Sequence, residues 1–536
     1  MFSTKTENNS SWLEWTASYH ESGGSDGNAS TLLTATFAVL LSILIATLFV
    51  PRRKRCHPVA PGNLPFIGHT LSLVNSDEFM SVLTRWANDV ARNSGTYEFY
   101  LFGQRWIVLC DEASVMRAMR MRPFKLCRPS RMNNAINSLG FTGLFTAEGN
   151  VWKKERRLVS PTLNMNHIGD YFSYIKLVAS RLTSKWARER AASSALMDLS
   201  KYSLDIAALS ILGMDFDSLN NPDHELARGI EELFHIMFRR SLSPVPYWKL
   251  PLCGNIDNGI QLSGKVAGIL KDLIRNYNKE KESGHIDKAR EKKTCLQNLV
   301  DASDGEDAKL EEDRVMGNLG TLIMAGTDTT STTLAACLWE LAHDHQLQEA
   351  LYKEITQSGL EMENLTLSHV VNGFPRLHAL LFEVLRLKGP APMIFLEPGE
   401  PFDFYGEVIK PGTMVCALTA VLSKKATSDV PPGPSGEGPQ NFCPQRWLVP
   451  QDSSDPSSPI TVIQPSSKQG GYMPFGHGPR ICPGAQLAKV EVLTGLFSIL
   501  KKFELAPIAN HPPVRRVSRF TETFDGEIQL ALKERQ

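Results

Sequence analysis

Apolar residues recur at three- and four-residue spacing along most of this chain, the period at which side chains share one face of an α-helix. The pattern runs through most of residues 177–300 and continues over 315–343 as one long segment. Shorter stretches with the same spacing predict further helices at 348–355, at 374–387 and from 485 to about 503. A mainly helical architecture therefore follows from the pattern alone.

Strand-like alternation is confined to short stretches. Residues 96–103 and 105–111 alternate around a turn at Gly103 and Gln104 and predict a β-hairpin. Residues 402–415 predict short strands, whereas 430–440 and 451–471 are so rich in Pro, Ser and Gly that we expect loops there. We therefore predict a mainly α fold with a minor β part. No internal repeat or linker is visible, so residues 69–536 are expected to form one large domain.

One uninterrupted apolar run lies near the start of the chain. Residues 31–50 carry no charged side chain, and at ~1.5 Å per residue this run spans about 30 Å, the thickness of a hydrocarbon core. A basic cluster at 52–55 follows directly, while residues 1–30 hold one lysine and four acidic residues. The positive-inside rule then predicts a single transmembrane helix with a lumenal tail at 1–30 and a cytosolic domain. A buried core helix is the alternative.

The segment 51–68 joins this apolar run to the domain. It combines the basic cluster with Pro58, Pro61 and Pro65, and prolines at this density forbid helix and stiffen the chain. We expect a hinge that orients the domain against the bilayer, with a plain linker as the alternative.

Charge and cysteine usage narrow the function classes. The chain holds 57 basic (Lys, Arg) and 57 acidic residues, so its formal net charge is zero. No basic excess therefore indicates binding to nucleic acid. The nine cysteines include no CxxC pair, which removes the common zinc and thioredoxin-like motifs and covalent haem attachment. A disulfide framework is not expected in so long a chain, so we expect a reducing compartment for the domain.

The loop from Phe475 to Gly484 contains a cysteine in an unusual setting. Its glycines allow the backbone to approach a flat group closely, and Cys482 lies where the loop meets the last predicted helix. Amide hydrogens and the helix dipole at that point favour a thiolate, and Arg480 offers a cation to an anionic group beside the sulfur. Haem iron with a thiolate ligand and anionic propionates satisfies these features together. A structural cysteine in a glycine-rich turn is the simpler alternative.

A second unusual segment lies inside the long helix. Ala325, Gly326, Asp328 and Thr329 belong to a stretch in which five threonines fall between 327 and 333. Together these threonines cost roughly 3 kcal/mol in helix propensity relative to alanine. Thr329 can donate a hydrogen bond to the Ala325 carbonyl and open the helix locally, and Asp328 and Thr329 then form an acid–alcohol pair that can deliver protons to dioxygen. Close packing of small residues against a neighbouring helix is the alternative.

Together these motifs resemble the cytochrome P450 family in its membrane-anchored, eukaryotic microsomal form. The Cys482 loop matches F-x-x-G-x-R-x-C-x-G in full, Ala488 and Glu491 follow as A-x-x-E, and residues 325–330 match [AG]-G-x-[DE]-T-T. The resemblance extends from about Pro58 to the C-terminus. It implies the P450 fold, haem b as cofactor, Cys482 as the metal ligand, and a place in the endoplasmic reticulum membrane.

Two weaker motifs take their meaning from this resemblance. Glu383 and Arg386 form E-x-x-R on one helix face, and with Arg446 in P-x-R-W they imply a structural lock on the segment before the cysteine loop. Trp152 and Arg156 form W-x-x-x-R and imply a propionate-binding pair. On the same grounds the remaining cofactor contacts are Ala325, Gly326, Phe475, Arg480 and Gly484.

The resemblance implies a monooxygenase that inserts one atom of dioxygen into an apolar, lipid-, sterol- or terpenoid-like substrate. Electrons would come from an NADPH-dependent flavoprotein reductase, for which the basic cluster at 153–157 is either a docking face or ordinary solvated surface. The substrate pocket is expected from residues 132–145, 234–247, 316–324 and 392–395, which are mostly apolar. The alternatives are a P450-fold isomerase or dehydratase that acts on a lipid peroxide without a reductase, and a non-catalytic haem-binding sensor.

One feature of the family is missing. After Pro390 the family usually supplies an arginine or histidine that reaches a haem propionate, but here the nearby charged residues are Glu397 and Glu400. The Pro- and Gly-rich segment 430–440 is a further departure, as an insertion. The resemblance therefore leaves one haem anchor unassigned.

Overall fold

The structure is a computed structural model. It describes residues 56–535 except for gaps at 75–78, 193, 244, 251–255, 284–292, 304–309, 426–428, 453, 456–457, 467–470, 510 and 519–520. The predicted tail at 1–30, the predicted membrane span at 31–50 and the start of the hinge lie outside the described residues. Within the described part, no helix is both long and apolar enough to cross a membrane.

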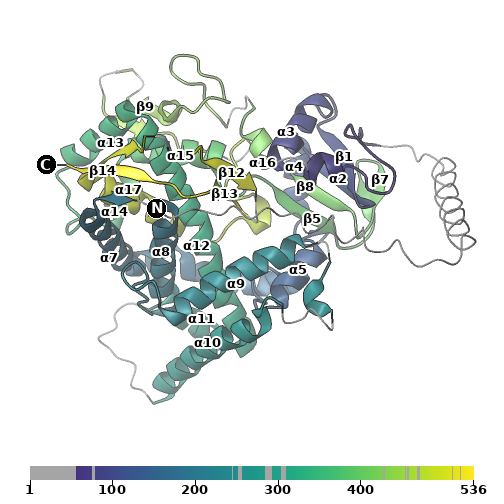
Figure 1. Ribbon diagram of the computed structural model, residues 1–536, viewed down its shortest axis with the longest axis horizontal. Coiled ribbons are helices and arrows are strands. Elements are labelled where there is room, and N and C mark those ends of the chain that lie inside the picture. Colours follow the sequence, from purple (N-terminus) through teal and green to yellow (C-terminus); the bar gives the residue numbers. More distant parts are fainter. Residues whose placement is uncertain are drawn as a thin grey trace, which may run out of the picture. The chain divides into compact units, whose positions relative to one another are not determined.

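Helices make up most of the described chain, and Figure 1 shows the larger ones gathered around α12. In chain order they are α2 (Thr70–Val74), α3 (Phe79–Asp89), α4 (Glu112–Met121), α5 (Ser130–Asn137), α6 (Gly149–Val159), α7 (Met165–Glu189), α8 (Ala195–Ala207), α9 (Glu225–Leu242), α10 (Gly259–Glu282), α11 (Cys295–Ser303), α12 (Glu312–His343), α13 (His345–Gln357), α14 (Leu367–Asn372), α15 (Pro375–Lys388), α16 (Thr419–Leu422) and α17 (Ala485–Lys502). All the helices that the spacing predicts are present. Their ends shift by a few residues, and at α13 the side chain of Asp344 caps the start of the helix.

Helix α12 is the longest described helix, and most of its residues are buried. Apolar side chains surround it on every side, as expected for a helix inside a core. It packs against α8, α10, α15 and α17. It ends at His343, and the next residue, Asp344, accepts a hydrogen bond from the backbone N–H of Leu347 (2.9 Å) and begins α13.

Strands form a minor part of the described chain. They are β1 (Thr96–Leu101), β2 (Gln104–Leu109), β3 (Leu126–Cys127), β4 (Ala191–Ala192), β5 (Ile394–Pro398), β6 (Phe402–Phe404), β7 (Glu407–Ile409), β8 (Met414–Ala417), β9 (Leu448–Pro450), β10 (Ile460–Val462), β11 (Phe503–Pro507), β12 (Arg515–Ser518), β13 (Glu522–Asp525) and β14 (Leu530–Glu534). The main sheet has the order β1-β2-β8-β5-β3. In it β2 and β8 are parallel, and the other neighbours are antiparallel.

The main sheet is covered on both faces because its strands alternate. Ile107 and Leu109 of β2 belong to one apolar cluster with α4, whereas Val108 between them belongs to another cluster with α3. The predicted hairpin is present as β1 and β2, with Leu101 paired to Gln104, so its turn lies at 102–103, one residue earlier than predicted. The predicted loop at 430–440 contains no helix or strand. The prediction for 451–471 is wrong in one respect, because β10 pairs with β9 there.

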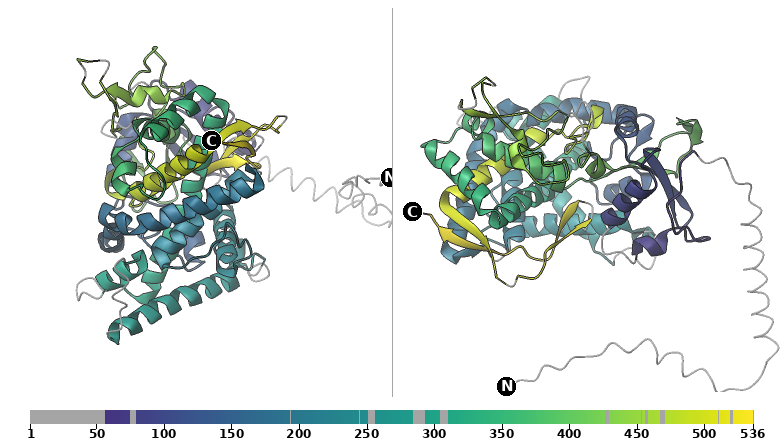
Figure 2. Two further views of the ribbon diagram at one scale, coloured as in Figure 1. Left: turned by 90° about the vertical axis from the view of Figure 1, so that its left-hand side faces the viewer. Right: turned by 90° about the horizontal axis from the view of Figure 1, so that it is seen from above.

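The last helix lies deep in the helical body. In Figure 2 the yellow-green α17 runs beside the blue α7, although the two are far apart in the sequence. Gly495 permits close packing, because a Cβ at this position would lie 3.0 Å from Leu334 of α12 and 3.2 Å from the Tyr202 hydroxyl of α8. The same hydroxyl donates a hydrogen bond to the Glu491 carbonyl (2.8 Å). These contacts hold the middle of α17 against α8 and α12, and the cysteine loop directly precedes this helix.

Candidate active site

The cysteine loop is a tight turn placed directly before α17. Gly476 and Gly478 adopt positive φ angles of 76° and 73°, which glycine adopts without steric cost. The backbone N–H of Cys482 donates to the Phe475 carbonyl (2.9 Å) and closes the loop. Cys482 is exposed and lines a cavity between the loop and α12, so the sulfur faces that cavity.

The cavity has a volume of 380 Å³, within the usual range for small-molecule sites. Its walls come from α12, the cysteine loop, the start of α17, β5 and the segment 122–163. Among the described residues that line it, Cys482 is the one cysteine. Cys482 is therefore the only described cysteine that borders this cavity.

The protein alone does not make Cys482 a thiolate. Although Cys482 is accessible from the cavity, the surrounding protein desolvates its thiol and raises the thiol pKa, while the Gly484 backbone N–H and the Arg156 guanidinium act in the opposite direction. The predicted help from a loop amide is thus present, but it does not outweigh desolvation. A metal ion bound to the sulfur would supply the missing effect, because a coordinated thiol is deprotonated outright.

The opposite wall of the cavity is the threonine-rich part of α12. Ala325, Gly326 and Thr329 all line the cavity, and a Cβ at Gly326 would meet no atom within 4 Å. Thr329 donates its hydroxyl hydrogen bond to the Ala325 carbonyl (2.8 Å), as predicted. The helix nevertheless remains helical throughout, so the predicted local opening is not observed.

Asp328 lies next to Thr329 but does not line the cavity. Its carboxylate accepts a hydrogen bond from the hydroxyl of Thr521, which precedes β13 and does line the cavity. Nothing in the sequence singled out Thr521, because its partner is 193 residues away.

The predicted cofactor contacts on α6 and the cysteine loop meet at one side of the cavity. Trp152, Arg156, Phe475, Arg480 and Gly484 all line it. Arg156 donates to the Ile481 carbonyl (2.7 Å), and the Arg480 guanidinium lies 5.1 Å from the centre of the Trp152 ring. Arg480 also forms an ion pair with Glu148 (2.5 Å). All the predicted haem contacts are thus assembled around one space.

Two further arginines, Arg122 and Arg128, also line the cavity, although no sequence motif pointed to them. Arg122 follows α4 and Arg128 follows β3. Arg128 donates to the Phe145 carbonyl (2.8 Å) and lies over the Phe145 ring at 3.5 Å. Neither arginine belongs to a recognisable sequence motif. Their relevance is visible only in the fold, which brings them to the same cavity as Arg480.

The predicted structural lock is present away from the cavity wall. The carboxylate of Glu383 on α15 accepts hydrogen bonds from Arg386 (2.8 and 2.7 Å) and Arg446 (3.1 Å), and also from the backbone N–H of Cys443 (2.8 Å) and the Trp447 indole (3.0 Å). Both arginine side chains are fully buried.

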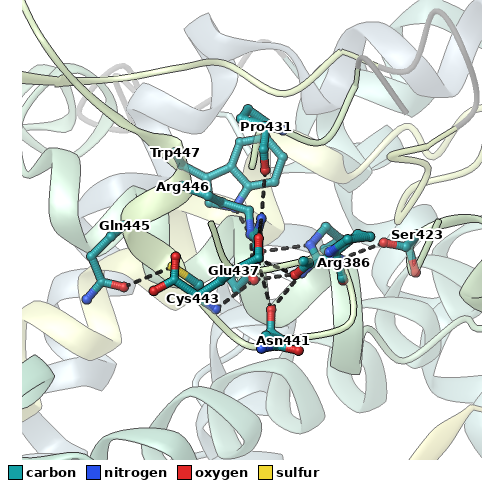
Figure 3. A network of polar contacts seen from close by, with 12 residues as sticks. Arg386, Ser423, Pro431, Glu437, Asn441, Cys443, Gln445, Arg446 and Trp447 are labelled. Carbon is teal, nitrogen blue, oxygen red and sulfur yellow. Dashed lines mark hydrogen bonds and ion pairs between the residues drawn. The ribbon is translucent and has the colours of Figure 1, made fainter. Parts of the chain in front are cut away.

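The guanidinium groups of Arg386 and Arg446 also bind the inserted segment 430–440 and its neighbours. Figure 3 shows Arg386 and Arg446 turned toward the carbonyl oxygens of the surrounding loop. Arg386 donates to Ser423 (2.6 Å) and Arg446 donates to Pro431 (2.6 Å), and both donate to the Asn441 carbonyl (3.2 and 3.0 Å). The two arginines therefore satisfy the Pro431 and Asn441 carbonyls of a segment that forms no helix or strand.

Comparison with known proteins identifies the family. The sequence matches the family model described as Cytochrome P450 over residues 58–521. The chain belongs to the cytochrome P450 family. It is 22% identical to cytochrome P450 4c21 of Blattella germanica, over 94% of this chain and 99% of that protein. It is 24% identical to cytochrome P450 3A5 of Homo sapiens, over 89% of this chain and 91% of that protein.

The same family appears among fungal proteins and solved structures. Identity with the cytochrome P450 monooxygenase sphH of Aspergillus fumigatus is 24%, over 88% of each chain. The crystal structure of the cytochrome P450DA heme domain matches with a TM-score of 0.72 at 21% identity, over 90% of this chain and 98% of that one. This match shows that the chain has the P450 fold. The protein is a P450 monooxygenase, which acts on dioxygen and a small-molecule substrate.

P450 enzymes hold haem on a cysteine thiolate, and the cavity of this P450 fits that group. It presents one thiol, an open wall at Gly326 and a side lined with guanidinium groups. Buried nitrogens of two of these groups, Arg122 Nε and Arg480 Nε, have no hydrogen-bond partner within the protein. Donors left in this state point to an anionic group in the cavity, which the haem propionates provide.

The predicted substrate pocket is only partly correct. Residues 392–395 line the cavity throughout, while 132–145 and 316–324 each contribute a few side chains. The described residues of the range 234–247 contribute none. It falls largely on α9, where Ile236 and Met237 pack into the core and Arg240 forms a buried ion pair with Asp257 (2.7 Å). Apolar spacing showed that α9 has a buried face but not which neighbour covers it.

Proposed function

We propose that this P450 inserts one atom of dioxygen into an apolar substrate of lipid, sterol or terpenoid type. The observation that carries the proposal is a cavity that is lined by one thiol and by many apolar side chains. The apolar lining includes Met132, Leu144, Phe145, Leu322, Ile394 and Phe395. Such a lining orients an apolar molecule by shape and excludes water from the site.

Cys482 is the proposed iron ligand. Haem iron held by this thiolate would supply dioxygen activation, because electron donation from the sulfur favours cleavage of the O–O bond. The chain contributes a rigid sulfur, held by the closed loop at the start of α17. The glycines beside it leave room for a flat macrocycle.

Asp328 and Thr329 are the proposed proton donors. Thr329 presents its hydroxyl in the cavity wall opposite the sulfur and holds a proton at Oγ1. Asp328 is placed one residue away, with its carboxylate oriented by the Thr521 hydroxyl. This arrangement suits transfer of a proton from the carboxyl side to the threonine and then to a reacting oxygen. An isomerase acting on a lipid peroxide needs no such relay, so the pair favours the monooxygenase.

Electrons are proposed to arrive from an NADPH-dependent flavoprotein reductase. Lys153 and Arg157 are exposed on α6, whereas Trp152 and Arg156 of the same helix line the cavity. A basic outer face directly behind the cofactor site suits an acidic partner that must bring its flavin close. The transmembrane helix at 31–50 and a location in the endoplasmic reticulum membrane remain part of this proposal, on the strength of the sequence alone.

The decisive test of the proposal concerns the sulfur. We expect Cys482→Ser to abolish the red-shifted Soret band of the reduced carbonyl adduct, because that band requires a thiolate ligand. The matched control is Cys127→Ser, since Cys127 is partly exposed but does not line the cavity. The Cys127→Ser control should keep the red-shifted carbonyl band and should still turn over substrate with NADPH and reductase. Survival of the band in Cys482→Ser would refute the ligand assignment.

A further inference from the structure

The family's basic residue after Pro390 has no counterpart on β5. The cavity-facing residues there are Met393, Ile394 and Phe395, which carry no charge. Glu397 further along β5 accepts hydrogen bonds from the backbone N–H groups of Ser130 and Gly412 (both 2.8 Å). Strand β5 therefore offers nothing to bind a propionate.

A cluster of three arginines, Arg122, Arg128 and Arg480, lines the cavity beside the strand that pairs with β5. Strand β3 pairs with β5, with Leu126 opposite Pro398 and Cys127 opposite Glu397. Arg128 comes directly after β3, and Arg122 lies four residues before β3, so both flank the strand that borders β5. Arg480 approaches from the cysteine loop, and all three arginines line the cavity.

The charges of this cluster are not balanced within the protein. Arg122 is only 5% exposed, and its Nε has no hydrogen-bond partner. Burial and the nearby Arg480 together lower the pKa of Arg122 to about 10. The nearby carboxylate is Glu148, which is already engaged by Arg480 (2.5 Å) and by the backbone N–H of Arg128 (2.8 Å). Three cations against one carboxylate leave two positive charges without a carboxylate to balance them.

Other carboxyl groups in the cavity lining do not supply the balance. Glu522 forms an ion pair with Arg516 (3.0 Å). Burial raises the pKa of Glu491 to about 8, so this carboxyl is neutral at pH 7. A buried, unpaired guanidinium is costly, and it is tolerable here if the bound cofactor brings the missing negative charge. Haem b brings two propionates.

We propose that Arg122 binds a haem propionate in this P450 and replaces the basic residue that is absent from β5. Arg122 lies near Arg480 and precedes β3 in the chain, and it lines the cavity together with Arg128, so the two arginines can act together on the anionic edge of the macrocycle. The inference rests on the haem being held by Cys482. A carboxylate of a substrate has the same chemistry as a propionate, so the experiment must separate the two sources.

The test is the rate at which the ferric holoenzyme loses haem to apomyoglobin. We expect Arg122→Met, which keeps the apolar stem and removes the charge, to lose haem roughly tenfold faster or more, the scale of one charge-assisted hydrogen bond. Arg122→Lys should lie between the native protein and Arg122→Met, because a lysine keeps the charge without the planar fork. The matched control is Arg131→Met, an exposed arginine on α5, which should lose haem at the native rate.

Two further arms decide the source of the carboxylate. In protein reconstituted with haem dimethyl ester, the native chain and Arg122→Met should lose the macrocycle at the same rate. If Arg122→Met instead leaves haem loss unchanged and abolishes the spin-state shift caused by a fatty acid but not by its methyl ester, Arg122 binds substrate and the proposal is wrong. If Arg122→Met changes neither the rate of haem loss nor the spin-state shift caused by the fatty acid or its methyl ester, the proposal is also wrong. Arg122→Met should keep the red-shifted carbonyl band, so this test is separate from that of Cys482.

Discussion

At the scale of single residues, two threonines of α12 make the same bond and have different surroundings. Thr327 donates to the Ile323 carbonyl and Thr329 donates to the Ala325 carbonyl, each at 2.8 Å. Thr329 lines the cavity and Thr327 does not. The back-bond is therefore a general way for a buried helix to satisfy a hydroxyl, and the position beside the cavity is what gives Thr329 a chemical role.

This difference gives a matched pair of variants. We expect Thr329→Ala to lower the product formed per NADPH by about tenfold or more and to release peroxide, because proton delivery in the cavity is lost. Thr327→Ala removes the same kind of bond and should keep the native ratio of product to peroxide. The measurement is the stoichiometry of NADPH, peroxide and product. Equal coupling in both variants would contradict the proton relay.

Residue-level predictions from the sequence succeeded where the chemistry is local. The bond from Thr329 to Ala325 spans one helical turn, and the sequence contains everything needed to expect it. Arg122 was missed because its burial and lack of a partner arise from Arg480 and Glu148, which are distant in the chain. The sequence identified groups that favour the Cys482 thiolate, but the opposing effect of desolvation could not be judged without the cavity.

At the scale of elements, the carboxylate of Glu383 joins α15 to the segment that precedes the cysteine loop. Arg386 is on its own helix, but Arg446 and Trp447 belong to a segment more than 60 residues later. Removal of one member would leave buried charges unpaired, which usually costs more than the network contributes as a whole.

We expect Glu383→Gln to lower the free energy of unfolding by about 3–5 kcal/mol. A surface pair serves as the control, because Lys501 and Glu361 form an ion pair (2.6 Å) in which Glu361 is 61% exposed. Glu361→Gln should cost at most about 1 kcal/mol. Urea unfolding of both holoenzyme variants measures the difference. A loss in Glu383→Gln no larger than in the control would show that the network is not a structural lock.

The sequence predicted elements whose pattern is local, but it did not predict which elements pair or pack with one another. The hairpin of β1 and β2 follows from alternation and a turn. The parallel pairing of β2 with β8 joins Trp106 to Met414, and neither strand carries a signal for the other. The same limit explains the wrong expectation for 234–247, where periodicity gave the helix α9 but not its distance from the cavity.

At the scale of the whole molecule, Glu491 links stability to pH. It is 4% exposed on α17, and burial raises the pKa of its carboxyl to about 8. The unfolded chain ionises this group from about pH 4.3, while the folded protein keeps it neutral. The stabilising effect of the neutral acid is therefore complete below about pH 4.3 and is lost as the pH rises toward 8.

We expect the native protein to lose up to about 1.4 kcal/mol of unfolding free energy per pH unit across this window through Glu491. Glu491→Gln cannot ionise, so it should gain stability relative to the native protein at pH 8 compared with pH 5. Denaturation midpoints at several pH values measure the effect, with exposed Glu363→Gln as the control. A difference between Glu491→Gln and the native protein that is the same at every pH would contradict the shifted carboxyl.

The cofactor cavity is built from opposite ends of the domain, and this has a consequence for synthesis on the ribosome. Arg156 and Ile481, which share a hydrogen bond, are 325 residues apart. At roughly 5–20 residues per second, translation takes about 16–65 s to pass from one to the other. During that interval the nascent chain has one wall of the site and lacks the sulfur. A ribosome that stalls before Cys482 therefore releases a polypeptide that cannot retain its prosthetic group through this sulfur, and the red colour of the product reports that translation passed this residue.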